Sequence, residues 1–320
     1  MDPAAPLGPL LAGSSPPAQA LEALVRKAAL SPAPAVVVGE GGTGKGAVAA
    51  ALHRLGPRAG GPLVATSLAA LAPTLIEAEL FGHEEGAFTG AGRARLGRFR
   101  QASGGTLVLE DIDQLPLDLQ GKLLRVLQEG EVEPVGAERP VKIDVRVVAT
   151  SARDLRASVA AGALRSDLYW RIAVLEIALP PLRARCEDIV PLAQALLARA
   201  GSRRTLAPAA EARLCAHPWP GNVRELENAV QRVLALGDDG RGPIEADELA
   251  FLGEELAGRA VELAQRALSL GITVDEFESA LLDSALREQR GNLAAAARQV
   301  GLSRRAFEYR RMRRGSEEQS

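Results

Sequence analysis

Eight consecutive residues place one lysine inside a glycine-rich run where a phosphate chain could bind. The run Gly39-Glu40-Gly41-Gly42-Thr43-Gly44-Lys45-Gly46 follows an apolar stretch over 36–38 and precedes an alanine-rich stretch over 47–55. A strand, a glycine loop and a helix in this order direct backbone N–H groups at phosphate oxygens, and Lys45 adds a positive charge near the β- and γ-phosphates. A glycine turn without a ligand is the alternative, but the order of these features favours a nucleotide site.

Two acidic residues offer ligands for a metal ion. The segment 104–111 is typical of a strand that ends at Glu110 and Asp111, an arrangement that holds Mg²⁺ and activates water in nucleotide hydrolases. Paired acids also occur as plain surface charge, but a phosphate loop earlier in the same chain favours the functional interpretation. Phosphate loops in general carry Ser or Thr after the lysine, whereas this chain has Gly46, so position 46 offers no hydroxyl to the metal.

A third stretch, over 80–91, is typical of a loop that contacts another molecule. It contains Gly86-Ala87-Phe88-Thr89-Gly90-Ala91, in a chain with only 3% aromatic residues. The glycines permit tight or left-handed turns, and Phe88 with Thr89 forms a small apolar tip that a soluble domain normally buries. A phenylalanine folded back into the core is the alternative interpretation.

The composition is that of an ordinary soluble protein. Its 320 residues, 47% hydrophobic and 24% charged, suffice for roughly two domains with a sizeable core. Cys186 and Cys215 lack a CxxC spacing, so neither a disulfide framework nor a structural zinc site is expected. The first 20 residues do not read as a signal peptide, and no apolar run reaches about 18 residues. We therefore expect a cytoplasmic protein without membrane contact. Its expected association with the nucleoid rests on the DNA-binding features of the last part of the chain.

The pattern of apolar residues predicts an α/β half followed by helices. Short apolar stretches at 35–38, 107–109 and 145–149 alternate with helical spacing, as in crossover units around a parallel sheet. After Pro180-Pro181 the spacing is helical. The expected parts are a flexible segment 1–20, an α/β nucleotide-binding subdomain 21–175, a helical lid subdomain 176–243, a linker 244–273 and an all-α domain 274–320.

The last part of the chain is strongly basic and has the spacing of a helix-turn-helix. The stretch 287–314 holds nine arginines and two glutamates, although the whole chain has a net charge of −2. A first short helix over 294–300, a turn at Gly301 and a second helix capped by Ser303 would place the second helix in the DNA major groove. An ordinary helical hairpin is the alternative. The candidate DNA contacts are Ser303, Arg304, Arg305, Tyr309 and Arg310.

From about residue 10 onward the chain resembles the bacterial enhancer-binding proteins, AAA+ activators of RNA polymerase that carries sigma-54. The matching motifs are GAFTGA at 86–91, LRSDLYWR at 164–171, PPLR at 180–183 and WPGNVRELEN at 219–228. GAFTGA is highly specific to that family. The terminal segment resembles the Fis-type domain that ends these activators. No receiver or sensory domain is expected before the ATPase, so control would come from elsewhere.

The resemblance implies a role for each matching residue. Arg165 and Arg171 would be arginine fingers that reach the ATP of a neighbouring subunit, and Arg224 on the lid would sense the γ-phosphate. Phe88 and Thr89 would contact sigma-54, supported by a second loop at 129–136. The implied cofactors are ATP and Mg²⁺. The implied partners are sigma-54 RNA polymerase, double-stranded enhancer DNA and further subunits, as a dimer when inactive and a hexameric ring when active.

The catalytic centre departs from the family pattern in four places. In the family, the strand that corresponds to 104–111 normally ends with Asp-Glu, whereas this chain has Glu110-Asp111. Each exchange moves a carboxylate by roughly 1 Å, and a misplacement of that size can cost about a hundredfold in rate. Ala152 stands where a polar residue is usual, Ser67 where an asparagine restrains the catalytic acid, and Gly46 where a glutamate is usual.

Two functions follow from this pattern. The first is an ATP-driven, sigma-54-dependent transcription activator that binds enhancer DNA and remodels the closed promoter complex. The alternative is a DNA-binding regulator that binds ATP, hydrolyses it slowly, and works in mixed rings with an active relative. A generic AAA+ chaperone or clamp loader is disfavoured, because neither needs GAFTGA or a terminal helix-turn-helix.

Overall fold

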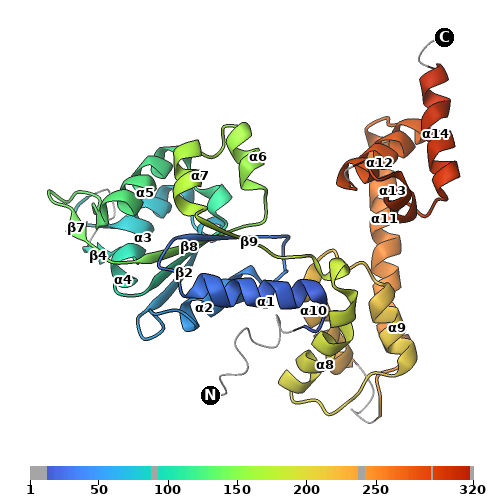
Figure 1. Cartoon of the computed structure of the whole chain (residues 1–320), viewed down its shortest axis with the longest axis horizontal. Helices are drawn as coiled ribbons and strands as arrows, with labels where there is room; N and C mark the ends of the chain where they lie inside the picture. The colour runs from blue at the N-terminus through green and yellow to red at the C-terminus, as the bar shows by residue number, and fades with distance from the viewer. Residues whose placement is uncertain (1–12, 88–92, 237–241, 290, 318–320) are drawn as a thin grey trace. The chain divides into compact units, whose positions relative to one another are not determined.

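The computed structural model describes residues 13–87, 93–236, 242–289 and 291–317 (Figure 1). Within these ranges only the backbone is described at 254–261 and 312–317. The chain divides into two compact units, with the boundary between Leu249 and Ala250. The first unit contains the nucleotide-binding motifs and the second contains the basic helices.

The first unit is built on a five-stranded parallel sheet in the order β2-β5-β8-β1-β9. In chain order the strands are β1 (Ala35–Val38), β2 (Leu63–Ser67), β5 (Thr106–Glu110), β8 (Arg146–Ser151) and β9 (Leu175–Ala178). Because the strands are parallel, their carboxyl ends meet at one edge of the sheet, where ligands of α/β proteins bind. The expectation of an α/β fold with a parallel sheet is confirmed.

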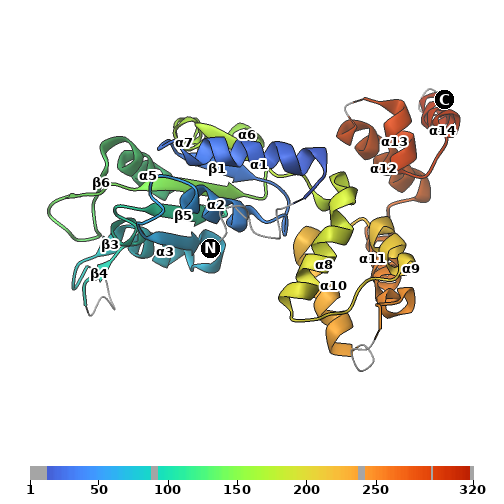
Figure 2. The ribbon, with the colours of Figure 1, turned by 60° about the horizontal axis from the view of Figure 1, so that its bottom comes forward.

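Helices cover both faces of this sheet. Val36 on β1 packs with one buried cluster, whereas its neighbours Ala35 and Val37 pack with the other, as the alternation of a strand requires. One face carries α1 (Pro16–Ala29) and α2 (Lys45–Arg54) (Figures 1 and 2). The opposite face carries α3 (Pro73–Phe81), α5 (Leu117–Glu129), α6 (Leu155–Ala160) and α7 (Ser166–Ile172).

A buried arginine joins the ends of the two helices that share a face. Arg146 on β8 is 3% exposed and donates hydrogen bonds to the carbonyl oxygens of Ala28, Ala29, Ala33 and Leu52. These oxygens lie at or near the carboxyl ends of α1 and α2, where carbonyl groups lack partners within a helix. Burial lowers the pKa of Arg146. The carbonyl groups at the helix ends thus carry the partial negative charge that stabilises the buried Arg146 guanidinium, a role that a carboxylate often fills.

Smaller elements complete the α/β part, and helices form the lid. The smaller elements are η1 (Leu68–Ala70), β3 (Gly82–His83), β4 (Arg95–Leu96), α4 (Arg98–Gln101), η2 (Ile112–Gln114), β6 (Glu131–Val132) and β7 (Val141–Lys142). The lid elements are η3 (Leu182–Ala184), η4 (Cys186–Asp188), α8 (Ile189–Arg199), α9 (Pro208–Ala216), α10 (Asn222–Leu236) and η5 (Ala246–Leu249). Trp219 is fully buried in the lid, and its indole N–H donates to the Leu214 carbonyl at 2.8 Å.

The second unit consists of helices. They are α11 (Phe251–Ser269), α12 (Val274–Glu288), α13 (Leu293–Gln299) and α14 (Arg304–Glu317). A small core centred on the buried Phe307 joins α12, α13 and α14. Thr273 caps α12 reciprocally with Glu276, and Asn292 caps α13. None of the helices in the described ranges is long and apolar enough to span a membrane.

Two segments differ from the sequence-based expectation. The expected linker 244–273 is largely helical, because α11 contains no proline and many strong helix formers such as Ala, Leu, Glu and Arg. The expected flexible segment 1–20 already enters α1 at Pro16. Ser15 caps that helix and two prolines occupy its first turn, where a missing N–H costs nothing.

Candidate nucleotide-binding site

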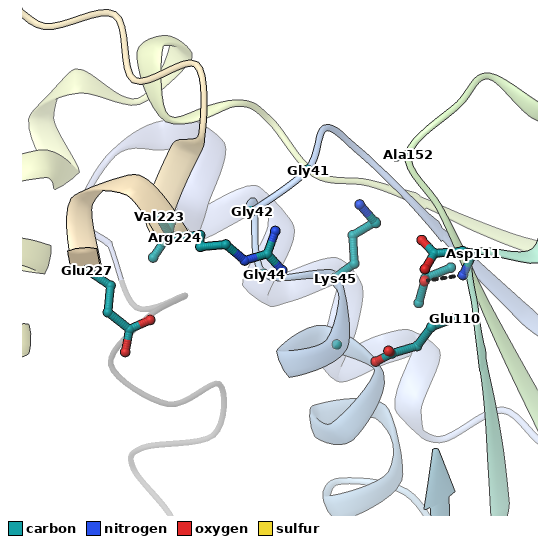
Figure 3. A pocket seen from close by; sticks show the side chains of 12 residues that line it. Gly41, Gly42, Gly44, Lys45, Glu110, Asp111, Ala152, Val223, Arg224 and Glu227 are labelled. Carbon is teal, nitrogen blue, oxygen red and sulfur yellow. Dashed lines mark hydrogen bonds between the residues drawn. The ribbon is translucent and has the colours of Figure 1, made fainter. Parts of the chain in front are cut away.

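The phosphate loop, the end of β5 and the lid enclose one cavity of about 400 Å³ (Figure 3). The predicted residues Lys45, Glu110, Asp111 and Arg224 all line it and come from three different elements. The complete lining is Gly41, Gly42, Gly44, Lys45, Gly46, Glu110, Asp111, Thr150, Ala152, Val223, Arg224 and Glu227. Segments that lie more than a hundred residues apart in the sequence therefore meet at this cavity.

The glycines of the loop are required by both backbone conformation and space. Gly44 precedes α2 with φ 101°, and Gly42 has φ 77°, values that favour glycine. A Cβ atom on Gly42 would lie 2.1 Å from the carbonyl oxygen of Gly221 in the lid. The Arg224 N–H donates to the Gly42 carbonyl at 3.3 Å. Only a residue without a side chain allows the lid to approach the loop so closely.

Lys45 is held inside the loop by carbonyl groups. Its Nζ donates to the carbonyl oxygens of Gly39 at 2.8 Å and Glu40 at 3.1 Å. Burial lowers the pKa of the Lys45 amine, and the Asp111 carboxylate partly offsets this effect. The ammonium group is thus positioned at the cavity before any phosphate binds.

Asp111 is fixed by contacts from two neighbouring strands. Its backbone is left-handed, at φ 59° and ψ 51°, which is uncommon for a residue with a side chain. The Ser67 hydroxyl donates to Asp111 Oδ2 at 3.3 Å, and the Asp111 N–H donates to the Thr150 hydroxyl at 3.4 Å. Ser67 therefore makes the contact expected of the restraining residue, through a shorter side chain. Ala152 lines the same cavity with a methyl group only.

One further acid beside this site was missed from the sequence. The Asp113 side chain is 6% exposed, accepts a hydrogen bond from the Ser151 hydroxyl at 2.9 Å, and lies 3.5 Å from the Arg153 guanidinium. Its proximity to the predicted acids in sequence was a signal that could have been used. Thr150 and Glu227 also line the cavity without having been predicted.

The Glu40 carboxylate bonds to the lid. Both of its oxygens accept hydrogen bonds from the Arg183 guanidinium, at 2.8 and 2.5 Å. Asn222 donates to the same carboxylate at 3.2 Å and to the Gly41 carbonyl at 3.0 Å. The bonds from Arg183 hold the pKa of Glu40 below its usual value, although burial opposes them. Glu40 was predicted to bind nucleotide. Because its carboxylate is bonded to Arg183 and Asn222, it is the backbone of Glu40 that remains available to a ligand.

The two predicted arginine fingers lie on or next to α7 and are not part of the cavity lining. Arg165 forms a bidentate pair with Asp167, at 3.1 and 2.8 Å. Arg171 donates twice to the Leu127 carbonyl oxygen near the end of α5. Both residues are exposed.

The predicted contact loop is described only at its base. Phe88, Thr89, Gly90 and Ala91 lie outside the described residues, whereas Gly86 is left-handed at φ 76° and the Ala87 N–H donates to the Glu84 carbonyl. Val135 in the second loop donates to the Gly82 carbonyl at 2.9 Å and accepts from the Glu84 N–H at 3.0 Å. The base of the first loop therefore rests on the second loop.

In the second unit, the predicted DNA contacts are exposed and lie on α14 or, for Ser303, just before its first residue. The Ser303 hydroxyl accepts a hydrogen bond from the Ala306 N–H, which confirms the predicted cap. Arg304 pairs with Glu308 at 2.8 Å, and Arg310 pairs with Glu278. Such exposed pairs contribute little to stability, so a phosphate group can compete for the arginines. Arg305 and Tyr309 are exposed on the same helix.

Three family models match successive parts of the chain. They are the Sigma-54 interaction domain over 11–178, the AAA+ ATPase lid domain over 183–262, and the Bacterial regulatory protein, Fis family, over 273–314.

Curated relatives match across most of the chain. The response regulator protein FleR of Pseudomonas aeruginosa is 42% identical, over 92% of this chain and 68% of that protein. The Nif-specific regulatory protein of Azotobacter vinelandii is 42% identical, over 94% of this chain and 58% of that protein. The Sigma54-dependent transcriptional activator SfnR of Pseudomonas putida is 43% identical, over 90% of this chain and 84% of that protein. The chain thus spans between just over half and most of the length of these relatives.

Solved structures resemble the chain over the same extent. NtrX from Brucella abortus in complex with ATP is 33% identical with a TM-score of 0.67, over 93% of this chain and 68% of that protein. The ADP complex of the same protein has a TM-score of 0.70.

Proposed function

This chain belongs to the sigma-54-dependent AAA+ transcription activators with a Fis-type DNA-binding domain, and from this premise we propose that it is an ATP-driven activator of sigma-54 RNA polymerase. The observation that carries the proposal is the cavity in which Lys45, the acids at the end of β5 and Arg224 of the lid face one another (Figure 3). ATP is the proposed ligand of this cavity.

Each group around the cavity has a role in binding ATP. The N–H groups of the glycine loop and of the first turn of α2 cradle the phosphates, and Lys45 compensates the charge of the β- and γ-phosphates. Arg224 reaches the same phosphates from the lid, so binding draws the lid onto the loop. The Gly42 carbonyl already accepts a hydrogen bond from the Arg224 N–H. A shift of the loop when nucleotide binds would therefore be passed directly to the lid.

The two acids at the end of β5 fit a magnesium ion. Mg²⁺ prefers oxygen ligands and is usually held by one or two carboxylates together with phosphates and water. Glu110 and Asp111 both line the cavity, and no hydrogen bond within the described residues engages the Glu110 carboxylate. When bound, Mg²⁺ neutralises charge on the phosphates. Asp111 then orients the attacking water and accepts its proton, while Ser67 restrains the carboxylate.

The output of ATP turnover is a movement of the Gly86–Ala91 loop against sigma-54. The proposed active form is a hexameric ring, in which Arg165 and Arg171 of one subunit reach the nucleotide of the next. A guanidinium group placed there neutralises charge on the transferring phosphoryl group. The contacts of Val135 with Gly82 and Glu84 support the loop from its base.

The second unit would bind enhancer DNA as a dimer. Val274, Phe277 and Leu281 follow one another on one face of α12, and they are 83%, 41% and 50% exposed. A second copy of this face would cover these apolar side chains and bring two α14 helices to the two halves of a palindromic site. Arg305, Tyr309 and Arg310 are the proposed contacts to base edges and phosphates.

A regulator that binds ATP but hydrolyses it slowly is the second candidate. It is favoured by the side chains at the reaction centre: the Asp111 carboxylate is one methylene shorter than a glutamate, and Ala152 has no polar atom with which to bind phosphate or water. Such a chain could act in a mixed ring whose other subunits hydrolyse ATP.

Steady-state ATP hydrolysis separates the two candidates. The purified chain is assayed for phosphate release over a range of concentrations, beside Lys45→Ala as the matched inactive control. The activator predicts turnover that rises with chain concentration and is absent from the control. Nucleotide binding without turnover above the control would favour the second candidate.

A further inference from the structure

The arginines of α14 fall into two groups by the side of the helix on which they lie. The buried Phe307 marks the side of α14 that packs against α12 and α13 (Figure 1). Along a helix, residues three and four positions apart share a side, whereas residues two positions apart lie on opposite sides. Arg305 and Tyr309 therefore lie on the outward side of α14. Arg310 and Arg311 lie one turn beyond Phe307, on the packed side.

Acidic residues of α12 pair with the two arginines on the packed side. The Arg310 guanidinium forms an ion pair with Glu278 and donates a hydrogen bond to that carboxylate. The Nε atom of Arg311 lies 3.6 Å from Oδ1 of Asp283. These four side chains are between 35% and 49% exposed. A DNA phosphate can therefore reach either arginine, but it meets a guanidinium group whose charge a carboxylate already compensates.

The outward side of α14 carries a charge that no acid of α12 compensates. Arg305 is exposed, and within the described part of the chain no ion pair engages it. Tyr309, one turn further along, is 68% exposed. Arg304 pairs with Glu308 inside α14 itself, at 2.8 Å. The outward side thus offers DNA a full positive charge and an aromatic ring, whereas the charges next to α12 are partly neutralised.

We propose that the two acids of α12, Glu278 and Asp283, compete with DNA phosphates for the arginines with which they pair, and thereby weaken binding to DNA of any sequence. Phosphate contacts supply essentially all of the affinity for DNA of unrelated sequence, because each contact releases counterions. An arginine that is already paired contributes less of this affinity, whereas the outward side chains keep their full contribution. The inference rests on the proposed binding of DNA by α14, and it goes further by assigning to α12 the control of its strength.

Binding to a DNA duplex of random sequence tests this competition. The affinity of the full chain is measured by fluorescence anisotropy over a range of salt concentrations. Glu278→Gln should bind this duplex about threefold more tightly than the wild type, the effect expected when an exposed ion pair no longer holds the arginine. Adding Asp283→Asn should bring the gain to about tenfold. The slope of log affinity against log salt should steepen by about 0.9 for each arginine that gains a phosphate.

Two controls separate competition from a general effect of charge. Glu262→Gln makes the same exchange at an exposed position on α11 and should change the affinity less than about twofold. In a chain that already carries Arg310→Gln, Glu278→Gln should give no further gain, because the arginine that it would release is absent. Equal thermal unfolding midpoints would show that every variant is folded.

The inference is overturned if Glu278→Gln binds the random duplex no more tightly than the wild type. It is also overturned if the gain from Glu278→Gln is as large with Arg310→Gln as without it, since the acid would then act only through the net charge. A wild-type chain that binds no DNA of any sequence at low salt would instead overturn the proposed DNA binding, and this inference with it.

Discussion

Arg171 donates two hydrogen bonds to the carbonyl oxygen of Leu127, from Nε at 3.1 Å and from Nη2 at 2.6 Å. Leu127 lies in the last turn of α5, which ends at Gly130 in a left-handed conformation. The chain then enters the second loop, whose Val135 pairs with Gly82 and Glu84, just before Gly86 in the sequence. On the proposed function, Arg171 would leave Leu127 for the nucleotide of a neighbouring subunit, and this would release a carbonyl group next to the loops proposed to contact sigma-54.

The first prediction concerns this finger. Arg171→Ala should leave nucleotide binding within about threefold of the wild type but lower hydrolysis by at least about a hundredfold, since an arginine finger is worth several orders of magnitude. Arg171 is not part of the cavity lining of its own chain. Nucleotide binding is measured at equilibrium with a fluorescent ATP analogue, and hydrolysis is measured as phosphate release.

Mixing two inactive variants provides the control. Lys45→Ala subunits keep their fingers and Arg171→Ala subunits keep their nucleotide sites, so mixed rings should recover part of the hydrolysis. If the mixture stays as inactive as each variant alone, the proposed action of Arg171 on a neighbouring subunit is wrong.

The second prediction concerns the contact between loop and lid. Gly42→Ala should destabilise the first unit, because its Cβ would lie 2.1 Å from the Gly221 carbonyl and φ is +77°. The matched control is Gly41→Ala, where nothing lies within 4 Å of the added atom. Thermal unfolding without nucleotide should show a lower midpoint for Gly42→Ala only. Equal midpoints for both variants would mean that the lid does not rest on Gly42.

The third prediction concerns the buried arginine of β8. Arg146→Met should lower the free energy of unfolding by about 3 kcal/mol, because the carbonyl groups of Ala28, Ala29, Ala33 and Leu52 lose a charged donor. Arg125→Met is the control: its guanidinium is largely exposed beside Glu129, and its loss should cost less than about 1 kcal/mol. Urea denaturation measures both. A loss for Arg146→Met as small as that of the control would contradict this account.

The fourth prediction is a pH dependence from the pair formed by Glu40 and Arg183. Because the pKa of Glu40 is lower in the folded chain than in the unfolded one, the pair stabilises the lid contact above about pH 4.5, the ordinary glutamate value, and loses this effect as the pH falls further. The side chains are partly exposed, so the effect should stay below about 1 kcal/mol.

Glu40→Gln should therefore be less stable than the wild type at neutral pH, and the difference should shrink as the pH falls below about 4.5. Arg183→Gln should show the same loss, and the double variant should lose no more than either single one. Denaturation curves across this pH range check the pattern. Additive losses would show that the two side chains act separately.

The fifth prediction concerns the DNA contact. Arg305→Ala should weaken binding to a DNA site selected from a random pool by about tenfold, the size of one lost base or phosphate contact. Arg266→Ala removes the same charge from an exposed position on α11 and should change binding less than about twofold. Fluorescence anisotropy at fixed salt compares them. Equal losses would indicate a charge effect without a specific role for Arg305.

The local parts of the site could be predicted from the sequence, because strand, loop and helix signals lie next to one another. Lys45 at the start of α2 and Glu110 at the end of β5 follow from such signals. The side-chain contact of Glu40 with Arg183 could not be predicted, because it joins segments far apart in the chain. Asp113 was missed for a similar reason, since its burial depends on Ser151 and Arg153 of a different strand and loop.

Boundaries were harder to predict than elements. The helix α11 lies where a linker was expected, although its sequence contains no proline and many strong helix formers. The start of α1 was placed too late, because the two prolines after Ser15 suggested irregular chain although they are well tolerated in a first helical turn.

Formation of open promoter complexes tests the central claim most directly. The purified chain is incubated with sigma-54 RNA polymerase and a promoter that carries its selected DNA site, with ATP or with a non-hydrolysable ATP analogue. An ATP-driven activator yields open complexes with ATP, few with the analogue, and none for Lys45→Ala or Thr89→Ala. If the wild-type chain binds both ATP and the DNA site yet yields no open complexes with ATP, the account is contradicted and the hydrolysis-impaired regulator is favoured.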